Sequence, residues 1–265
     1  MSLKIENMSY AYGDHKVLDK INFEIPSGAL TCILGANGIG KSTLFRCILR
    51  LNDDYTGHCY LNGLDAKLLS IQELAKQIAY IPQSHAPAFN YKVIEIVLMS
   101  TTAQMGNFKG PGDKEKKVAM EALERVGMAA FAEQGYTQIS GGERQLVLIA
   151  RALAQQTKII IMDEPTSNLD YGNQIRILSK VKQLTREGYT IIQSTHHPDQ
   201  AFMYADEVIV LEKGNLIHHG TPKEIISEPM IQKIYHINVE INSLYDDLVR
   251  VTIPIDEITN QLGCK

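Results

Sequence analysis

The sequence predicts an α/β fold built around a mostly parallel sheet, and three observations support this class. Short apolar runs typical of buried strands alternate with segments of helical spacing, which favours parallel strands covered by helices. A glycine-rich loop stands between one such strand and a helix. The 265 residues are enough for one large domain with insertions, but too few for two independent catalytic domains.

The composition excludes several other classes. Lysine and arginine number 26, aspartate and glutamate 30, and 45% of the residues are hydrophobic. This balance argues against disorder, collagen-like repetition and a strongly basic nucleic-acid footprint, so we expect no nucleic-acid partner. The four cysteines show no metal-type spacing, and we expect reduced structural thiols at Cys32, Cys47, Cys59 and Cys264.

The start of the chain and its apolar runs predict where the protein resides. The opening MSLKIENMSY has neither the basic nor the apolar region of a signal peptide. No window approaches the roughly 20 apolar residues that a bilayer-spanning helix needs. We therefore expect a cytosolic protein whose contact with a membrane runs through a partner.

Strand-like apolar runs open the chain. They lie at residues 3–8, 17–25 and 29–34, and the third continues directly into GANGIGKST and the helical spacing of Leu44, Phe45, Ile48 and Leu49. This order predicts a strand, a glycine-rich loop and a helix. A short strand follows at 59–61, and a further apolar segment at 78–81 ends at Pro82 and Gln83.

The middle of the chain changes to helical spacing. Residues 93–128 predict a helical insertion, interrupted by a Gly/Pro-rich breaker at 106–112. Strands and helices then alternate again, with helices at 142–154 and 173–186 and strands at 159–162, 190–195, 207–211 and 215–218. The last 35 residues predict a small hairpin, because apolar runs at 239–241 and 248–253 flank a polar turn.

The glycine-rich loop carries the first chemical signal. Residues 35–42 fit the pattern G-x-x-x-x-G-K-[ST], in which backbone N–H groups and the start of the following helix enclose the oxygens of a triphosphate. Lys41 supplies a positive charge for the β- and γ-phosphates, and Ser42 supplies a hydroxyl ligand for Mg²⁺. The competing interpretation is a glycine-rich turn without a ligand. The predicted nucleotide contacts of this loop are Asn37, Gly38, Gly40, Lys41, Ser42 and Thr43.

Two acids end the apolar strand at 159–162. Asp163 suits Mg²⁺, held directly or through water, and Glu164 suits the general base that orients and deprotonates an attacking water. Two acids at a strand end are often only a solvated turn. Their presence in the same chain as the phosphate loop favours the catalytic interpretation.

A second helix start has the features of an anion site. Ser140, Gly141 and Gly142 open a helix, where unpaired N–H donors and the positive end of the helix dipole favour negative charge. An ordinary helix cap is the alternative. The chain thus carries two phosphate-type sites but only one acidic pair.

At this point the sequence resembles the ATP-binding cassette family of transporter ATPases over nearly its whole length. The segments GANGIGKST, ISGGERQ, IIIMDEPTSNLD and STHH stand in the family order and at family-like separations. The resemblance implies a P-loop NTPase core with a mostly parallel sheet, an N-terminal antiparallel β region, a helical subdomain inserted at about 84–139 and a short C-terminal hairpin. We expect an ATP-binding domain over 1–230 and a small appendage over 231–265 packed on it.

The same resemblance implies that the subunit works as a pair. In the family, two cassettes associate head to tail, so that the phosphate loop of one and the signature serine and glycine of the other enclose one ATP. Ser140 and Gly142 are therefore expected to complete the site of a second copy, and the loop of Asp170 to cross the interface.

Three further residues match family positions. Tyr12 resembles the aromatic residue that stacks on adenine, with a core tyrosine as the alternative. Gln83 resembles the glutamine that contacts Mg²⁺ and the attacking water and joins the helical insertion to the core; a plain loop glutamine is the alternative. His196 resembles the histidine that contacts the γ-phosphate, although a lone histidine is more often structural.

Within the family, the stretch from Val93 to Arg144 resembles cassettes of importers for iron-siderophores, haem, cobalamin or oxyanions such as molybdate. This implies membrane permease subunits as direct partners, an extracytoplasmic binding protein as an indirect one, and a peripheral location on the cytoplasmic face of the cell membrane. The apolar residues from Ala88 to Phe108 suit a docking surface for the permease, with an internal core as the competing explanation.

Two other function classes stay open on the sequence. A soluble ATPase of the same family would act without a membrane subunit, although this chain has one cassette and no long coiled coil. A nucleotide-binding regulatory module that does not hydrolyse ATP is the other alternative, and the presence of Glu164 and His196 argues against it.

Overall fold

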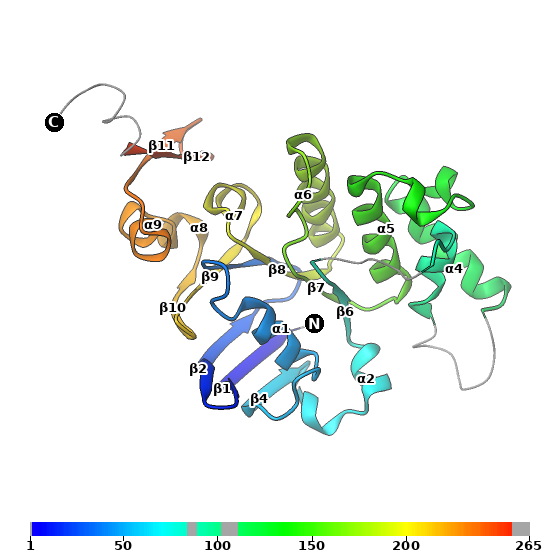
Figure 1. The fold of residues 1–265 in the computed structure, drawn as a ribbon, viewed down its shortest axis with the longest axis horizontal. Coiled ribbons are helices and arrows are strands. Elements are labelled where there is room, and N and C mark those ends of the chain that lie inside the picture. The colour runs from blue at the N-terminus through cyan, green and yellow to red at the C-terminus, as the bar shows by residue number, and fades with distance from the viewer. Residues whose placement is uncertain (1, 84–88, 102–110, 256–265) are drawn as a thin grey trace.

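A six-stranded, mostly parallel sheet forms the centre of the molecule (Figure 1). The computed structural model describes residues 2–83, 89–101 and 111–255. The strands lie in the order β10-β9-β3-β8-β7-β6, and all neighbours are parallel except β10, which pairs antiparallel with β9. Their bounds are β3 Leu30–Leu34, β6 Ile78–Ile81, β7 Ile159–Met162, β8 Thr190–Thr195, β9 Glu207–Glu212 and β10 Asn215–Gly220.

The strands at the middle of this sheet are buried along their whole length. Every residue of β3, β7 and β8 is buried, because helices or a second sheet cover both faces. Continuous apolar runs, instead of an alternating pattern, are typical of such strands. The sequence predicted these three strands to within one residue, and the α/β class with a mostly parallel sheet is confirmed.

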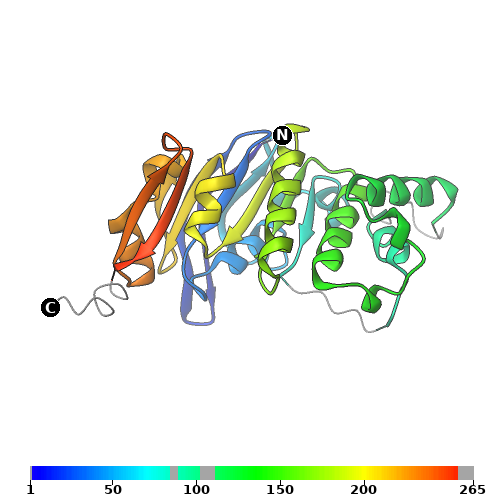
Figure 2. The same cartoon turned by 90° about the horizontal axis from the view of Figure 1, so that it is seen from above.

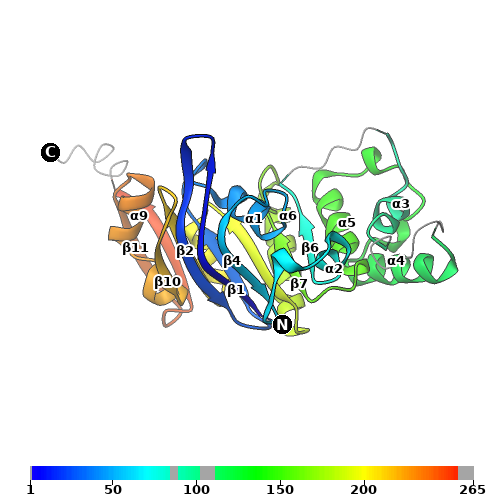
Figure 3. The ribbon, with the colours of Figure 1, turned by 90° about the horizontal axis from the view of Figure 1, so that it is seen from below.

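The N-terminal strands form a second, antiparallel sheet. Its order is β2-β1-β4-β5, with β1 Leu3–Tyr12, β2 His15–Ile25, β4 Thr56–Leu61 and β5 Leu64–Asp65. Helix α1 (Lys41–Ile48) shares one apolar core with residues of both sheets, and Figure 3 shows it among the N-terminal strands. The N-terminal antiparallel β region is therefore present as expected.

The insertion helices and the helix that follows them cover the other face of the six-stranded sheet at one end. The insertion helices are α3 (Val93–Leu98) and α4 (Asp113–Arg125), the following helix is α5 (Gly141–Ala154), and all three share a core with β3, β6 and β7. Helix α6 (Tyr171–Arg186) packs beside α5. Because Val93, Ile96 and Val97 are fully buried there, much of the apolar pattern predicted as a docking surface forms an internal core instead. Met99 remains exposed, and residues 84–88 and 102–110 lie outside the described part.

The C-terminal hairpin lies at the end of the molecule opposite to the insertion (Figures 1 and 2). Its strands are β11 (Val239–Leu244) and β12 (Val249–Pro254), close to the predicted runs. Thr252 donates from both its backbone N–H and its hydroxyl to Asp199 at the start of α7 (Pro198–Tyr204), at 3.2 and 2.9 Å. This contact joins the hairpin to the helix that follows His196.

Four short helices were not predicted: α2 (Ile71–Ala75), α7, α8 (Pro222–Ile225) and α9 (Glu228–Tyr235). Proline stands in the first turn of the last three, and Ser70 and Glu73 form a capping box on α2. Helix α9 spans the predicted division at 230 and 231. That division stays a prediction.

Three cysteines, Cys32, Cys47 and Cys59, are buried and free, and burial raises the pKa of each thiol to about 12. These three positions fit the expected structural thiols, whose reduced state stays a prediction, and Cys264 lies outside the described residues.

Candidate nucleotide site

The glycine-rich loop runs from the end of β3 into α1. Gly38 and Gly40 adopt φ values of +76° and +109°, which L side chains rarely reach. A Cβ at Gly40 would also lie 3.1 Å from Val17, so the loop cannot hold a larger residue there without movement. These two glycines give the loop its tight path into the first turn of the helix.

Lys41 is held inside this loop. Its ammonium donates to the carbonyl oxygens of Gly35, at 2.8 Å, and Ala36, at 3.1 Å, and only 5% of the residue is exposed. Burial lowers the pKa of Lys41, and the nearby charge of Glu164 opposes that change. The ammonium lies 3.5 Å from the Glu164 carboxylate.

The acidic pair stands where β7 ends. The Asp163 N–H donates to the Ile81 carbonyl at 2.9 Å, which fixes the acid beside β6. Glu164 has φ of +44°, a conformation that is uncommon for a non-glycine residue and occurs often at functional sites. This turn directs the two carboxylates differently: Asp163 is buried, whereas Glu164 faces the loop of Lys41.

Ser194 in β8 connects the two acids. Its hydroxyl donates to an Asp163 carboxylate oxygen at 2.6 Å and accepts the Glu164 backbone N–H at 2.8 Å. Ser194 was not among the predicted site residues. Only the order of strands in the sheet could have indicated it. The parallel pairing of β7 with β8 places Met162 opposite Gln193, and therefore brings Ser194, the next residue, beside the acids that follow Met162.

Gln83 and His196 approach the same carboxylate from two sides. The Gln83 amide donates to Glu164 Oε2 at 3.1 Å, and His196 Nδ1 lies 3.4 Å from that oxygen. Gln83 follows β6 and His196 follows β8. Residues far apart in the chain thus meet at Glu164, because the carboxyl ends of parallel strands lie at one edge of the sheet.

A cavity of about 350 Å³ opens over this arrangement. It is lined by Asn37, Gly38, Gly40, Lys41, Ser42, Thr43, Gln83 and Glu164, all of them predicted site residues. Asp163 and His196 do not line it but adjoin it through Ser194 and Glu164. The roles assigned to these residues stay predictions.

The donor set around Asp163 fits Mg²⁺. Ser42, Asp163 and Gln83 present oxygens, which this hard cation prefers, and Asp163 is 96% buried. Ser194 donates to one carboxylate oxygen of Asp163, and the described residues supply no donor to the other oxygen. No cluster of three or more His, Cys, Asp or Glu side chains that could hold a metal occurs within residues 2–83, 89–101 and 111–255.

Tyr12 lies away from the cavity, at the end of β1. Its ring is 48% exposed, which argues against a core tyrosine, and its hydroxyl accepts a hydrogen bond from the Asn52 side chain at 3.0 Å. The ring is edge-on to Tyr10. An exposed aromatic ring held in place by two contacts is suited to stacking on a base.

The helix start at Ser140 does not line the cavity either. The Ser140 hydroxyl caps α5 by accepting the Glu143 N–H at 3.3 Å, and Glu143 in turn accepts the Ser140 N–H at 2.7 Å. The ordinary cap considered in the sequence analysis is therefore present. Anion binding by Ser140, Gly141 and Gly142 stays a prediction.

Gly142 lies directly against the start of α6. A Cβ at this position would be 2.4 Å from the side chain of Asn173. Asn173 is bound to Asp170, which caps α6 and accepts the Asn173 N–H at 2.9 Å. Gly142 is itself buried, so Asn173 links the exposed residues Ser140 and Gly141 at the start of α5 to the exposed Asp170 at the start of α6.

Tyr235 is a second residue that the sequence analysis missed. Its ring comes from the end of α9 and packs against the main core, and its hydroxyl is buried. Burial and the negative charge of Glu164 raise the pKa of Tyr235. The C-terminal part of the chain therefore reaches the surroundings of the acidic pair.

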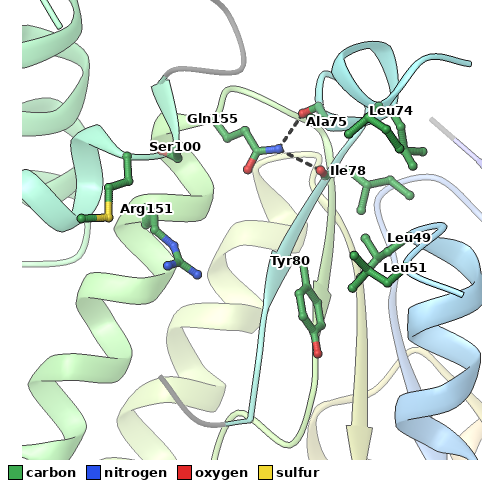
Figure 4. Close-up of a pocket in the computed structure, with 11 residues that line it drawn as sticks. Leu49, Leu51, Leu74, Ala75, Ile78, Tyr80, Ser100, Arg151 and Gln155 are labelled. Atoms are coloured by element: carbon green, nitrogen blue, oxygen red, sulfur yellow. Dashed lines mark hydrogen bonds between the residues drawn. The ribbon is translucent and has the colours of Figure 1, made fainter. Parts of the chain in front are cut away.

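A second, more open hollow lies between α5 and the edge of the sheet at β6 (Figure 4). Its volume is about 340 Å³, and it is lined by residues of α2, β6 and α5 and by residues that follow α1 and α3. We call it the α5 groove and define it by Leu51, Ile71, Tyr80, Met99, Arg151 and Gln155. Leu51 and Ile71 are more than 60% exposed, so the groove presents apolar side chains to solvent.

Comparisons with known proteins agree with this geometry. The model of the ABC transporter family matches residues 18–167. The iron(3+)-hydroxamate import ATP-binding protein FhuC of Bacillus subtilis is 34% identical over 241 residues, which cover 91% of this chain and 90% of FhuC.

Two solved structures extend the likeness to the whole fold. A chain of a metal-chelate type ABC transporter in an inward-facing conformation matches with a TM-score of 0.84 at 29% identity, over 96% of this chain and 97% of that one. The dimeric structure of MJ0796, a bacterial ABC transporter cassette, matches with a TM-score of 0.71 at 29% identity, over 83% and 98%. Among the residues placed here, no helix is long and apolar enough to cross a bilayer.

Proposed function

The chain belongs to the ABC transporter family of ATP-binding, ATP-hydrolysing proteins, and from that premise we propose that it powers a membrane importer. The cargo we propose is an iron-siderophore, haem, cobalamin or an oxyanion. The proposal that the chain hydrolyses ATP rests on one observation: Lys41, Gln83 and Glu164 line the same cavity and contact one another through Glu164.

The proposed reaction places each residue in a distinct role. Backbone N–H groups of Asn37 to Thr43 bind the phosphate oxygens, and Lys41 releases its two carbonyl contacts to bind the β- and γ-phosphates. Glu164 accepts the proton of the attacking water, and the Gln83 amide positions that carboxylate. His196 contacts the γ-phosphate from the other side of Glu164.

Mg²⁺ would be held by Ser42, Asp163 and Gln83 and would neutralise charge that develops on the phosphates. Ser194 holds the Asp163 carboxylate in place through its 2.6 Å hydrogen bond. Tyr12, exposed at the end of β1, stacks on the adenine.

A second copy of the chain is the first proposed partner. Ser140, Gly141 and Asp170 are exposed outside the cavity of their own chain, where the starts of α5 and α6 meet, and the buried Gly142 packs between them against Asn173. In a head-to-tail dimer they complete the site of the other copy. ATP then holds the two copies together, and loss of the γ-phosphate contacts after hydrolysis lets them separate.

Membrane permease subunits are the second proposed partner, and the α5 groove is their docking site. Its exposed apolar side chains suit a segment of another protein. FhuC and the metal-chelate type transporter are relatives whose names refer to import or to transport of chelated metals. The proposed location is therefore peripheral, on the cytoplasmic face of the membrane, with an extracytoplasmic binding protein acting through the permease.

The test is to express the chain with any membrane permease found encoded in its gene neighbourhood and to reconstitute the pair in lipid vesicles. We expect copurification, ATP hydrolysis that the loaded binding protein stimulates, and solute uptake that a Lys41→Ala variant does not support. Hydrolysis by the isolated chain without any copurifying membrane protein would favour the soluble alternative. Nucleotide binding without phosphate release would favour a regulatory module.

A further inference from the structure

Tyr235 carries a buried hydroxyl that makes no hydrogen bond to any described residue. The residue ends helix α9, and its ring packs against the main core. Burying a hydroxyl without a hydrogen bond costs free energy, so few buried polar groups in native proteins lack a partner. A phenylalanine ring would fill the same space. Packing alone therefore does not account for the hydroxyl of Tyr235.

The position of α9 places this hydroxyl beside the phosphate loop. Lys233, two residues before Tyr235, pairs with Glu212 at the end of β9 at 3.1 Å. The carbonyl oxygen of Leu211, the preceding residue of β9, lies 2.9 Å from the point that a Cβ on Gly35 would occupy. The end of α9 is therefore fixed at the edge of the sheet where β3 passes into the loop.

The surroundings of the hydroxyl keep it neutral and leave its oxygen available. Burial and the negative charge of Glu164 raise the pKa of Tyr235. The backbone N–H of Gly35 approaches the phenolic oxygen and opposes this rise, without reaching the distance and angle of a hydrogen bond. Since a neutral hydroxyl accepts hydrogen bonds through its oxygen, the Gly35 N–H is a donor placed to use it.

Gly35 is also the residue on which Lys41 rests. Its carbonyl oxygen accepts the Lys41 ammonium at 2.8 Å, and the proposed reaction requires Lys41 to leave this oxygen for the phosphates. Gly35 is buried, and a Cβ there would lie 2.9 Å from both Ile39 and Leu211. In such close packing a small displacement of the loop is enough to make or break a hydrogen bond at Gly35.

We propose that Tyr235 is a positioning residue of the nucleotide site: its hydroxyl accepts the Gly35 N–H once Lys41 has turned to the phosphates, and it holds the start of the phosphate loop against ATP. This inference rests on the proposed function. Because the hydrogen bond forms as ATP binds, its free energy adds to nucleotide affinity instead of to the stability of the fold.

The test is Tyr235→Phe, which removes the hydroxyl and keeps the ring. The full chain is titrated with AMP-PNP, a non-hydrolysable analogue of ATP, in the presence of Mg²⁺. The dissociation constant should rise about 2- to 12-fold, the range for one neutral hydrogen bond. The midpoint of thermal unfolding without nucleotide should stay the same or rise, because an unpaired buried hydroxyl is removed. A purely structural hydrogen bond would give the opposite pattern, a lower midpoint with unchanged affinity.

Tyr55→Phe is the matched control. Tyr55 is 2% exposed, and its hydroxyl is likewise buried without a hydrogen bond to a described residue. It belongs to the core that α1 shares with both sheets, and it does not line the nucleotide cavity. The two tyrosines thus share an unpaired hydroxyl but not a position beside the phosphate loop. Tyr55→Phe should leave the dissociation constant of AMP-PNP unchanged and the midpoint equal or higher.

A second measurement reads the proposed contact directly. Hydrogen exchange at the Gly35 amide is followed by NMR in a chain labelled with heavy-nitrogen glycine. AMP-PNP should slow this exchange in the unaltered chain and in Tyr55→Phe. It should slow the exchange less in Tyr235→Phe, because the acceptor of the Gly35 N–H is gone.

The outcomes separate this inference from the function beneath it. If the dissociation constant of Tyr235→Phe rises less than twofold, or if its thermal midpoint falls, the positioning role is refuted and the proposed function stands. Equal slowing of Gly35 exchange in the unaltered chain and in Tyr235→Phe would also refute it. If the unaltered chain does not bind AMP-PNP at all, the proposed function falls together with this inference.

Discussion

Removal of the Ser194 hydroxyl should weaken the site without touching any residue that contacts ATP. In Ser194→Ala, Asp163 loses a 2.6 Å hydrogen bond and the Glu164 N–H loses its acceptor. Ser194 is fully buried and Asp163 is 4% exposed, so water cannot easily replace the hydroxyl. Asp163 then has no fixed orientation toward Mg²⁺.

The hydrogen bond to Asp163 sets the expected change in Mg²⁺ dependence, and the hydrogen bond from the Glu164 N–H sets the expected loss of stability. A hydrogen bond to a charged group contributes about 1.5–3 kcal/mol. At about 1.4 kcal/mol per tenfold, this corresponds to a rise of about 10- to 150-fold in the Mg²⁺ concentration that gives half-maximal ATP hydrolysis. The free energy of unfolding should fall by about 1–3 kcal/mol, because a buried N–H is left without an acceptor.

The assay is steady-state phosphate release against Mg²⁺ concentration at fixed ATP, with thermal unfolding measured in parallel. Thr185→Val is the matched control: it removes a buried hydroxyl that donates to the Lys182 carbonyl within α6, away from the cavity. The control should lose some stability and keep the Mg²⁺ dependence of the unaltered chain. A Mg²⁺ dependence of Ser194→Ala within twofold of the unaltered chain would refute the role of the hydroxyl.

Four further outcomes are expected. Glu164→Gln should retain ATP binding and trap the dimer while hydrolysis falls by about 10²-fold or more, and near-normal phosphate release would overturn the assignment of the base. Lys41→Ala should abolish tight ATP binding in a titration; unchanged affinity would count against the phosphate-loop interpretation. A mixture of Ser140→Arg and Lys41→Ala chains should form heterodimers with one intact site, so activity above that of either variant alone is expected, and its absence argues against a shared site. Gly142→Ala should press a Cβ against Asn173, 2.4 Å away, and destabilise the chain by about 1–3 kcal/mol in thermal unfolding, whereas an unchanged midpoint would show that this contact relaxes freely.

The elements that the sequence predicted correctly are those whose signal is local. The strand at 159–162 is a continuous apolar run buried on both faces, and the loop at 35–42 is defined by residue type and spacing. The short helices were missed because their apolar faces span barely one turn. Pro198 in the first turn of α7 and the capping box of Ser70 on α2 were readable signals of their start.

Within the site, the residues of each motif could be predicted from the sequence. The contacts between residues of different motifs could not. Ser194 reaches Asp163 only because β8 lies next to β7, and the order of strands in a sheet is not written in any local pattern. Tyr235 lies in a helix about 70 residues further along the chain than Glu164. Only tertiary packing brings the two residues near each other. The apolar residues of α3 illustrate the converse error, since a surplus of apolar side chains indicated a surface where the fold builds a core.

Strand β6 gives the proposed permease contact a physical route to the proposed catalytic base. Tyr80 lines the α5 groove, and Gln83, three residues later, donates to Glu164. Between them, Ile81 pairs with Met162 of β7 and accepts the Asp163 N–H, so this piece of chain cannot shift without disturbing the acidic pair. A strand fixed at both ends transmits small displacements because packed interiors resist compression. Coupling by this route requires that ATP and the permease each favour one of two positions of Gln83. Gln83 is placed to adopt both positions, because it is exposed, donates a hydrogen bond to Glu164 and is followed by the insertion.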